Sequence, residues 1–255
     1  MKKAVLLMAA AGLCVCLFAA GCGKKQPDKL EQVKSAQELR VLVVENAEPY
    51  SFYSEKGQAY LGIEVSIAQE IAADLDVRLV TVPVAKADIL NSLPQADLAI
   101  GRIGNYDSLR SSYSVSNPYA QGTLYVATPR GVYFTTLGAF TGKSVGVSDQ
   151  LSEPARITVN GAQNVTLQSF TDANSAAKSL LDKTITGYFC YEEQAQSLMK
   201  NSKIQVQAVL NTDPESYVIA ADKNASSLIA QVNRTIARLL ENGTIDSYRE
   251  QFSKS

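Results

Sequence analysis

The 255-residue chain contains no histidine and no tryptophan. Without histidine, Ser-His-Asp triads, HExxH zinc sites and imidazole general bases are excluded. The motifs GxSxG and GxGxxG and the P-loop are also missing from the sequence. We therefore expect no cofactor, no metal centre and no catalytic role.

Long apolar runs are scarce as well, and the only one covers residues 4–21, after two lysines. A positive start, an apolar run and small residues before a cysteine are typical of an export signal. The ending Ala19-Ala20-Gly21-Cys22 resembles the lipobox of bacterial lipoproteins, which implies removal of residues 1–21 and lipid attachment at Cys22. The alternative is an uncleaved transmembrane helix, because the run is near the shortest spanning length. We expect a lipid-anchored protein on the extracytoplasmic face of a bacterial membrane, in the periplasm or at the cell surface.

Neither sign of charge dominates, and three of the four cysteines lie in residues 1–22. Two of the 24 basic residues leave with residues 1–21, so 22 remain against 25 acidic residues. Such a balance gives no basic surface for nucleic acid. Beyond Cys22 only Cys190 remains, so we expect no intramolecular disulfide. Because Cys190 ends an apolar strand and has no imidazole partner, we interpret it as buried packing. We expect a monomer.

The length after the leader suits two lobes of about 100 residues each. Residues 22–38 are lysine-rich and polar, which predicts a flexible linker behind the lipidated cysteine. From Leu39 onward short apolar strands alternate with amphipathic helices, the pattern of an α/β fold with parallel sheets. We expect strands at 39–44, 77–82, 97–100, 144–147, 165–167, 185–189 and 217–220, and helices at 62–75, 86–93, 172–181, 226–240 and the C-terminus.

Several short stretches, each weak alone, occur in a characteristic order. They are Leu39-Arg40-Val41, Pro49-Tyr50-Ser51-Phe52, Gly62-Ile63-Glu64-Val65-Ser66-Ile67-Ala68, Val82-Pro83-Val84, Asp97-Leu98-Ala99-Ile100, Ser116-Asn117-Pro118-Tyr119, Gly142-Lys143-Ser144-Val145-Gly146-Val147 and Glu241-Asn242-Gly243-Thr244. Through them the chain resembles the bacterial extracellular solute-binding proteins of family 3, the polar-amino-acid-binding components of ABC importers.

The resemblance implies a two-lobed, periplasmic-binding-protein-like (type II) fold. Each lobe would be a mostly parallel sheet flanked by helices, and two strands would form the hinge. Lobe 1 would contain residues 39–127 and 217–255, and lobe 2 residues 128–216. The expected function is to capture an amino acid or related small carboxylate by closing the lobes and to deliver it to a permease. Closure requires contacts from both lobes, since a solute touching one lobe would not shift the equilibrium.

In the family an arginine of lobe 1 usually binds the α-carboxylate of the solute. Gap-free counting puts Leu109 at that position, so the candidates are Arg110, one residue later, and Arg102, which stands where the family usually has a small residue lining the cleft. A guanidinium pairs naturally with a carboxylate. The alternative for either residue is a solvated surface side chain.

The lobe 2 anchors also depart from the family. The acidic position expected after strand 185–190 holds Tyr191, followed by Glu192, and either could face an ammonium group. A glutamate there also suits a helix N-terminus without any ligand. Ser152 keeps a hydroxyl in the expected oxyanion-binding turn and could equally be an N-cap.

Aromatic candidates follow the first strand, where relatives stack a ring on the solute. Tyr50 is the better candidate and Phe52 the second, and core packing is the alternative for both. Glu64 we interpret as a capping carboxylate at a helix start, and Tyr119 as packing.

Two other functions compete with transport. A sensor, or a homologue whose pocket has drifted from amino acids, would fit the displaced anchors. A lyase or dehydratase on the same scaffold could use Glu192 or Glu193, although fold alone does not fix function.

Overall fold

The computed structural model describes residues 28–134, 136–149, 151, 155–156, 159, 161, 164–209 and 214–253. The expected signal segment, Cys22 and Ser152 lie outside these residues. In the described part of the chain, no helix has the length and hydrophobicity needed to cross a membrane. The same residues contain no cluster of three or more acidic or cysteine side chains that could hold a metal ion.

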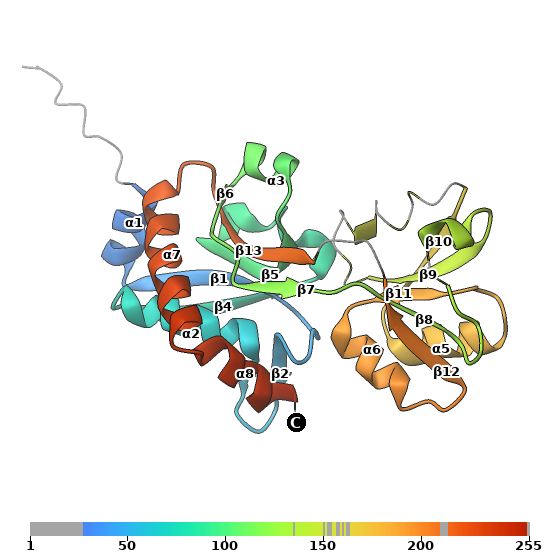
Figure 1. The fold of residues 1–255 in the computed structure, drawn as a ribbon. Helices are drawn as coiled ribbons and strands as arrows, with labels where there is room; N and C mark the ends of the chain where they lie inside the picture. Colours follow the sequence, from blue (N-terminus) through green and yellow to red (C-terminus); the bar gives the residue numbers. More distant parts are fainter. Residues whose placement is uncertain are drawn as a thin grey trace, which may run out of the picture.

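Two sheets form two lobes that lie side by side (Figure 1). Lobe 1 has the strand order β4-β1-β5-β13-β6, with β7 paired to β13, and lobe 2 has the order β10-β9-β11-β8-β12. The lobe 1 strands are β1 (Glu38–Val44), β4 (Arg78–Val84), β5 (Leu98–Gly104), β6 (Ser114–Val115), β7 (Ala120–Gly122) and β13 (Glu215–Ala221). The lobe 2 strands are β8 (Tyr125–Pro129), β9 (Ser144–Ser148), β10 (Thr166–Phe170), β11 (Tyr188–Cys190) and β12 (Ile204–Ala208).

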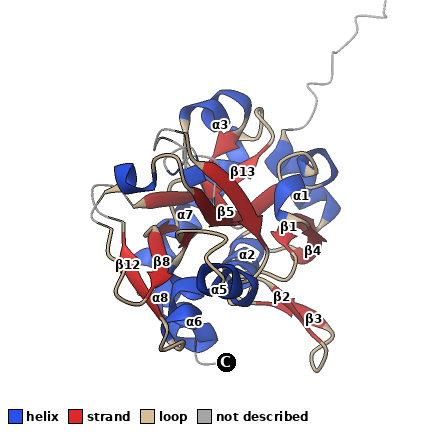
Figure 2. Cartoon of the chain, turned by 90° about the vertical axis from the view of Figure 1, so that its right-hand side faces the viewer, coloured by secondary structure: helices blue, strands red, loops and turns tan. Residues whose placement is uncertain are grey.

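Helices cover both sheets, and a two-stranded hairpin extends from lobe 1 (Figures 1 and 2). Lobe 1 carries α1 (Lys29–Ala36), α2 (Ile63–Asp74), α3 (Asp107–Ser112), α7 (Ser226–Glu241) and α8 (Thr244–Ser253), with the hairpin β2 (Phe52–Ser54) and β3 (Ala59–Leu61). Lobe 2 carries α5 (Ala173–Leu181) and α6 (Glu192–Met199). Three short 3-10 turns are η1 (Lys86–Asp88), η2 (Leu93–Gln95) and η3 (Leu137–Phe140).

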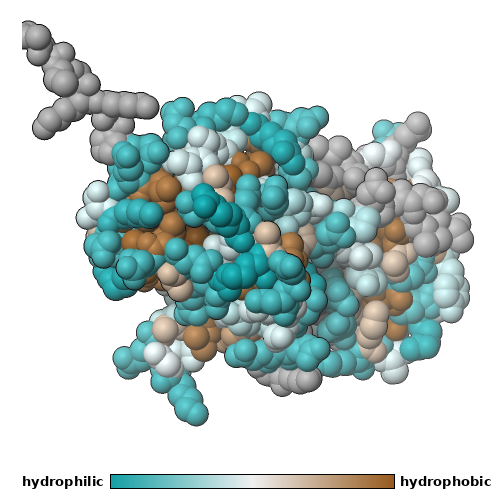
Figure 3. All heavy atoms as spheres, turned by 60° about the vertical axis from the view of Figure 1, so that its left-hand side comes forward, coloured by the Kyte–Doolittle hydropathy of each residue, from teal (hydrophilic) through white to brown (hydrophobic). Residues whose placement is uncertain are grey.

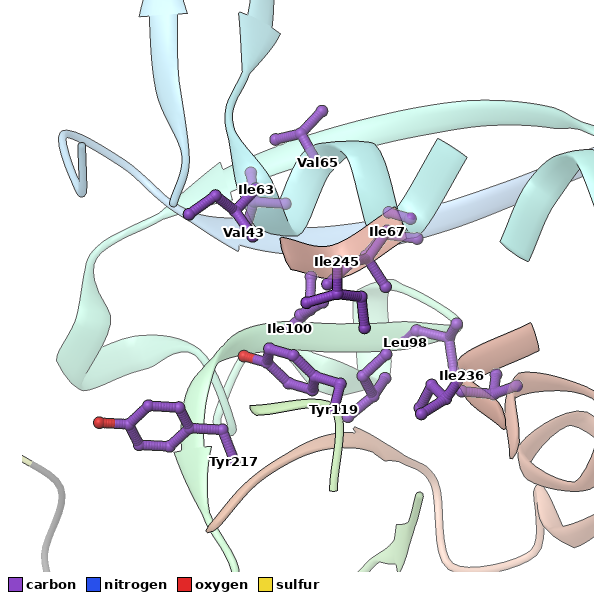
Figure 4. Packing of buried hydrophobic residues seen from close by; sticks show 14 of the residues in the cluster. Val43, Ile63, Val65, Ile67, Leu98, Ile100, Tyr119, Tyr217, Ile236 and Ile245 are labelled. Atoms are coloured by element: carbon purple, nitrogen blue, oxygen red, sulfur yellow. The ribbon is translucent and has the colours of Figure 1, made fainter. Parts of the chain in front are cut away.

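Strand β1 is buried on both faces, as a central parallel strand must be. Val41 and Val43 join the core beneath α2 and α7, whereas Leu42 and Val44 join a second core on the opposite face of the sheet. Figure 4 shows Tyr119 beside Ile100 in the first of these cores, which continues into lobe 2. The surface in Figure 3 is mostly hydrophilic, with hydrophobic side chains in scattered patches.

Most expected elements are present, but two differ. The flexible linker predicted over 22–38 contains α1, because Asp28 and Glu31 form a capping box and Val33 is buried against the core. The helix expected at 86–93 is replaced by η1 and η2, the second of which has a proline in its first turn.

The crossing between lobes also differs from the expected boundary at residues 127 and 128. β7 pairs with β13 in lobe 1, whereas β8 pairs with β11 and β12 in lobe 2. The first crossing therefore lies between Gly122 and Tyr125, and the expected boundary falls inside β8. The second lies between β12 and β13. The expected boundary came from the resemblance to the family, whereas the pairing of β8 places residues 125–129 in the sheet of lobe 2.

Candidate functional site

The candidate site lies where the carboxyl ends of the parallel strands of both lobes meet. In open α/β sheets this edge is where ligands bind. An open cavity of about 590 Å³ lies between the lobes there. Its lobe 1 lining is Asn46, Ala47, Glu48, Pro49, Arg102 and Phe252, and its lobe 2 lining is Thr171, Asp172, Ala173, Gln194, Gln196, Ser197 and Lys200.

Arg102 is the buried cation of this cavity, with 4% of the residue exposed. Its guanidinium carbon lies 4.4 Å from the centre of the Tyr50 ring, a cation-π contact that holds the side chain over the aromatic face. A guanidinium presented at a cavity wall is suited to a carboxylate, because its donors match the two carboxylate oxygens.

A bulge in β5 gives Arg102 this position. Strand β13 pairs Val218 with Ile103 and Ala220 with Ala99, so Ile100–Arg102 of β5 lie opposite one residue. We call this segment the β5 bulge. Arg102 has a positive φ of 49° within it. Bulges redirect a side chain from the regular strand alternation, and unusual backbone conformations of this kind gather at functional sites.

Two buried groups hold the bulge from the side of α2. The Arg102 backbone N–H donates to Glu64 Oε1 at 2.7 Å and to the Tyr119 hydroxyl at 3.1 Å. The Tyr119 hydroxyl also donates to Glu64 Oε1. Burial and the Glu64 charge raise the pKa of Tyr119 well above its usual value, so the hydroxyl remains a donor. Glu64, interpreted from sequence as a helix cap, therefore supports the bulge instead.

Lys86 holds the bulge from the end of β4, and the sequence reasoning missed it. Its Nζ donates to the backbone carbonyls of Gly101 and of Arg102, the latter at 2.9 Å. Burial and then the neighbouring Arg102 charge lower the pKa of Lys86 to about 7. The available signal was its place directly after a parallel strand, beside the ends of β1 and β5.

The loop carrying Tyr50 is fixed by the start of α2. The backbone N–H groups of Ile63 and Glu64 donate to the carbonyls of Pro49 and Tyr50, at 3.1 and 2.9 Å. Gly62 permits this approach, because a Cβ there would lie 2.3 Å from the Tyr50 carbonyl oxygen, and its φ is +127°. The ring of Tyr50 is thus placed under Arg102 by backbone contacts.

The other lobe 1 candidates lie elsewhere. Arg110 is exposed on α3, where its carbonyl accepts from Lys223 Nζ. Leu109, at the position where the family has its arginine, is buried in the core. Phe52 packs edge-on against Phe252 with ring centres 6.1 Å apart. The structure therefore brings Tyr50 and Arg102 together but not Arg110.

In lobe 2, Tyr191 is buried at the end of β11 and contacts β13 of lobe 1. Its hydroxyl donates to Glu215, and its ring meets the Tyr217 ring edge-on at 5.7 Å. Glu192 is exposed and accepts from Gln196 within α6. Asp172, which lines the cavity, caps α5 by accepting from the Ser175 N–H at 2.8 Å. Tyr191 therefore serves the hinge region in this structure.

Comparison with known proteins gives the family. The sequence profile described as "Bacterial extracellular solute-binding proteins, family 3" matches residues 39–255. The chain belongs to this family. Both its two-lobed fold and its solute-binding role follow from that membership.

Solved structures similar to this solute-binding protein share its fold. The amino acid ABC transporter substrate-binding protein AbpA of Streptococcus pneumoniae, bound to L-arginine, is 22% identical with a TM-score of 0.75, covering 88% of this chain and 98% of that one. A mutant of ArgBP from T. maritima is 21% identical with a TM-score of 0.73, covering 89% and 100%.

One curated relative is an enzyme. Cyclohexadienyl dehydratase of Pseudomonas aeruginosa is 29% identical over 122 residues. The match spans 47% of this chain and 45% of the dehydratase, so it extends over less than half of either protein.

Proposed function

We propose that this protein is the substrate-binding component of an ABC importer and captures an amino acid or a related small carboxylate by closure of its two lobes. Lipid attachment at Cys22 would hold it at the extracytoplasmic face, as a monomer, beside its permease. The relative AbpA carries the same transport role in its name, which supports the import context.

The observation that carries the proposal is Arg102, which lines the cavity between the lobes and is held over the Tyr50 ring. The carboxylate of the solute would pair with Arg102, and its body would pack near Tyr50. The carboxylate of Asp172, on the lobe 2 wall of the same cavity, suits an ammonium group. A zwitterion bound in this way touches both lobes, which is the condition for closure.

A thermal-shift panel of the purified protein with amino acids, amines and small organic acids tests this proposal. A solute present at 100 times its dissociation constant stabilises the folded state by about 2.7 kcal/mol, which raises the midpoint by roughly 5–10 °C for a chain of this size. L-Arginine enters the panel first, since it is bound in AbpA. Silence across the panel, with the protein shown to be folded, would instead favour a sensor or a drifted pocket.

Calorimetry on variants of Arg102 and Arg110 then tests which residue binds the carboxylate of the solute. R102A should weaken binding of the responding amino acid about 10- to 150-fold, the loss of a hydrogen bond to a charged group. R110A is the matched control and should bind as the unmodified protein does, because Arg110 is exposed on α3. Equal affinities for R102A and the unmodified protein would remove Arg102 from the site.

The dehydratase match gives one alternative a specific basis. An enzyme would turn over a cyclohexadienyl substrate, and E192Q would abolish that turnover while leaving the protein folded. We expect no turnover, since Glu192 is exposed and bonded within its own helix.

A further inference from the structure

Lys86 donates hydrogen bonds to the backbone carbonyls of Arg102 and of the residue before it. It follows β4 directly, and β4 lies next to β1, which in turn pairs with β5. Its Nζ donates to two successive carbonyls, those of Gly101 and Arg102, within the β5 bulge. Backbone carbonyls in an interrupted strand need partners from outside the ladder. Lys86 supplies such a partner to both.

The bulge is held on opposite sides by groups of opposite charge. The carboxylate of Glu64 and the hydroxyl of Tyr119 accept hydrogen bonds from the Arg102 backbone N–H, whereas Lys86 donates to the Arg102 carbonyl. Together these bonds fix both peptide groups of a residue that has a positive φ. The direction of the Arg102 side chain therefore depends on the two supports.

Charged groups from several elements surround Lys86. Arg102 of β5 repels it, whereas Glu64 of α2, Glu215 of β13 and Asp149 after β9 attract it. Of the three carboxylates, Glu215 belongs to β13, next to the second crossing between the lobes, and Asp149 belongs to lobe 2. Lys86 thus lies in the same electrostatic field as the proposed solute.

We propose that Lys86 is a positioning residue for solute binding: its two hydrogen bonds hold the β5 bulge so that the Arg102 guanidinium faces the cavity. This inference rests on the proposed function, because it gives Arg102 a solute to bind. In this proposal Lys86 affects solute affinity through Arg102, without contacting the solute itself.

Calorimetry with L-arginine tests the effect on binding. K86M, which keeps the length of the side chain but removes its donors, should weaken binding about tenfold or more, on the scale of one charge-assisted hydrogen bond. K86R, which keeps a positive charge and hydrogen-bond donors, should bind L-arginine more tightly than K86M does. K178M, at an exposed lysine of α5, is the matched control and should change nothing. Binding by K86M within twofold of the unmodified protein would overturn the proposal.

A second readout does not depend on the solute. The backbone amide of Arg102 gives an NMR resonance whose shift and exchange protection report its bonds to Glu64 and Tyr119. K86M should shift this resonance and reduce its protection, while amides of α7 stay unchanged. An unchanged Arg102 amide in K86M would overturn the proposal.

The two readouts distinguish this inference from the proposed function. If the unmodified protein does not bind L-arginine, or if R102A binds it normally, the assignment of solute or anchor fails. The Arg102 amide then decides the role of Lys86 by itself. If R102A loses binding and K86M does not, the proposed function stands and the positioning role is wrong.

Discussion

Arg102 combines burial, charge and an unusual backbone conformation in one residue. Burying a cation is costly unless it meets a partner of suitable charge or geometry. Here the Tyr50 ring provides one face, and the cavity lies beside it. A buried guanidinium at a cavity wall is suited to an anionic group of a solute, which is why Arg102 stands at the centre of the proposed site.

Lys86 gives the binding reaction a pH dependence whose sign can be stated. Burial and the Arg102 charge lower the pKa of Lys86 to about 7. A carboxylate bound at Arg102 would favour the charged form of Lys86 and raise its pKa. Binding should therefore take up protons just above pH 7, and affinity should fall as pH rises from 7 to 9.

Calorimetry at pH 7.5 in phosphate and in Tris measures this proton uptake, because the two buffers have different ionisation enthalpies. The unmodified protein should take up a fraction of a proton per L-arginine bound, and K86M should take up none. Proton release, or identical enthalpies in both buffers for the unmodified protein, would contradict this account.

Sequence reasoning gave Tyr50 and Arg102 as candidates but did not predict the hydrogen bonds that hold the β5 bulge. Both residues follow apolar strands that the sequence pattern predicts, so their positions near strand ends were visible from the sequence. Lys86 was missed because residues 86–93 were interpreted as one helix, whereas the structure has two short 3-10 turns there. The sequence placed Tyr191 after strand 185–190, but its hydrogen bond to Glu215 could not be predicted. Glu215 comes close only because the chain returns to lobe 1 in β13, and no local pattern shows this.

At the level of elements, the junction between the Tyr50 loop and α2 depends on Gly62. Two features exclude a side chain there, the φ of +127° and the Tyr50 carbonyl 2.3 Å from a Cβ position. Gly131 shares the positive φ, at +87°, but a Cβ there would have nothing within 4 Å. An alanine at Gly131 would meet only the cost of a positive φ, whereas an alanine at Gly62 would also clash with the Tyr50 backbone.

G62A should lose more stability than G131A. The left-handed conformation alone costs an alanine about 1–2 kcal/mol, which is the loss expected for G131A. G62A adds the displacement of the Tyr50 loop, so its free energy of unfolding should fall further and its affinity for solute should fall too. Urea unfolding of both variants checks this, and equal losses would argue against a steric role for Gly62.

Helix α1 illustrates what composition alone misses. Residues 29–36 are polar and lysine-rich, which predicts a linker, yet a capping box and one buried valine suffice for a short helix on the lobe. The ion pair of Lys29 with Asp97, at 2.7 Å, adds a contact to the loop before β5. Short helices depend on tertiary contacts, so the periodicity of eight residues could not reveal this one.

At the scale of the whole molecule, the order of elements was predictable because parallel α/β folds impose a strong repeating pattern. The order of strands in each sheet was not, since β8 and β13 each follow a crossing between the lobes and pair antiparallel with strands distant in sequence. The crossing near β8 was therefore misplaced, although the two-lobed fold was correct. Fold and family follow from many weak matches in order, whereas a site depends on a few residues.

Closure also belongs to this scale, because it requires a solute that contacts both lobes. Arg102 presents the lobe 1 contact, while Asp172 and Gln194 line the lobe 2 wall of the same cavity. A solute bound only at one wall would not change the distance between the lobes.

Small-angle X-ray scattering with and without the amino acid that responds in the thermal-shift panel tests the central claim most directly. The radius of gyration of the unmodified protein and of R110A should decrease when the solute is added, and that of R102A should not change at the same concentration. Closure of R102A to the same extent, or solute binding by the unmodified protein without any decrease, would contradict capture between the lobes through Arg102.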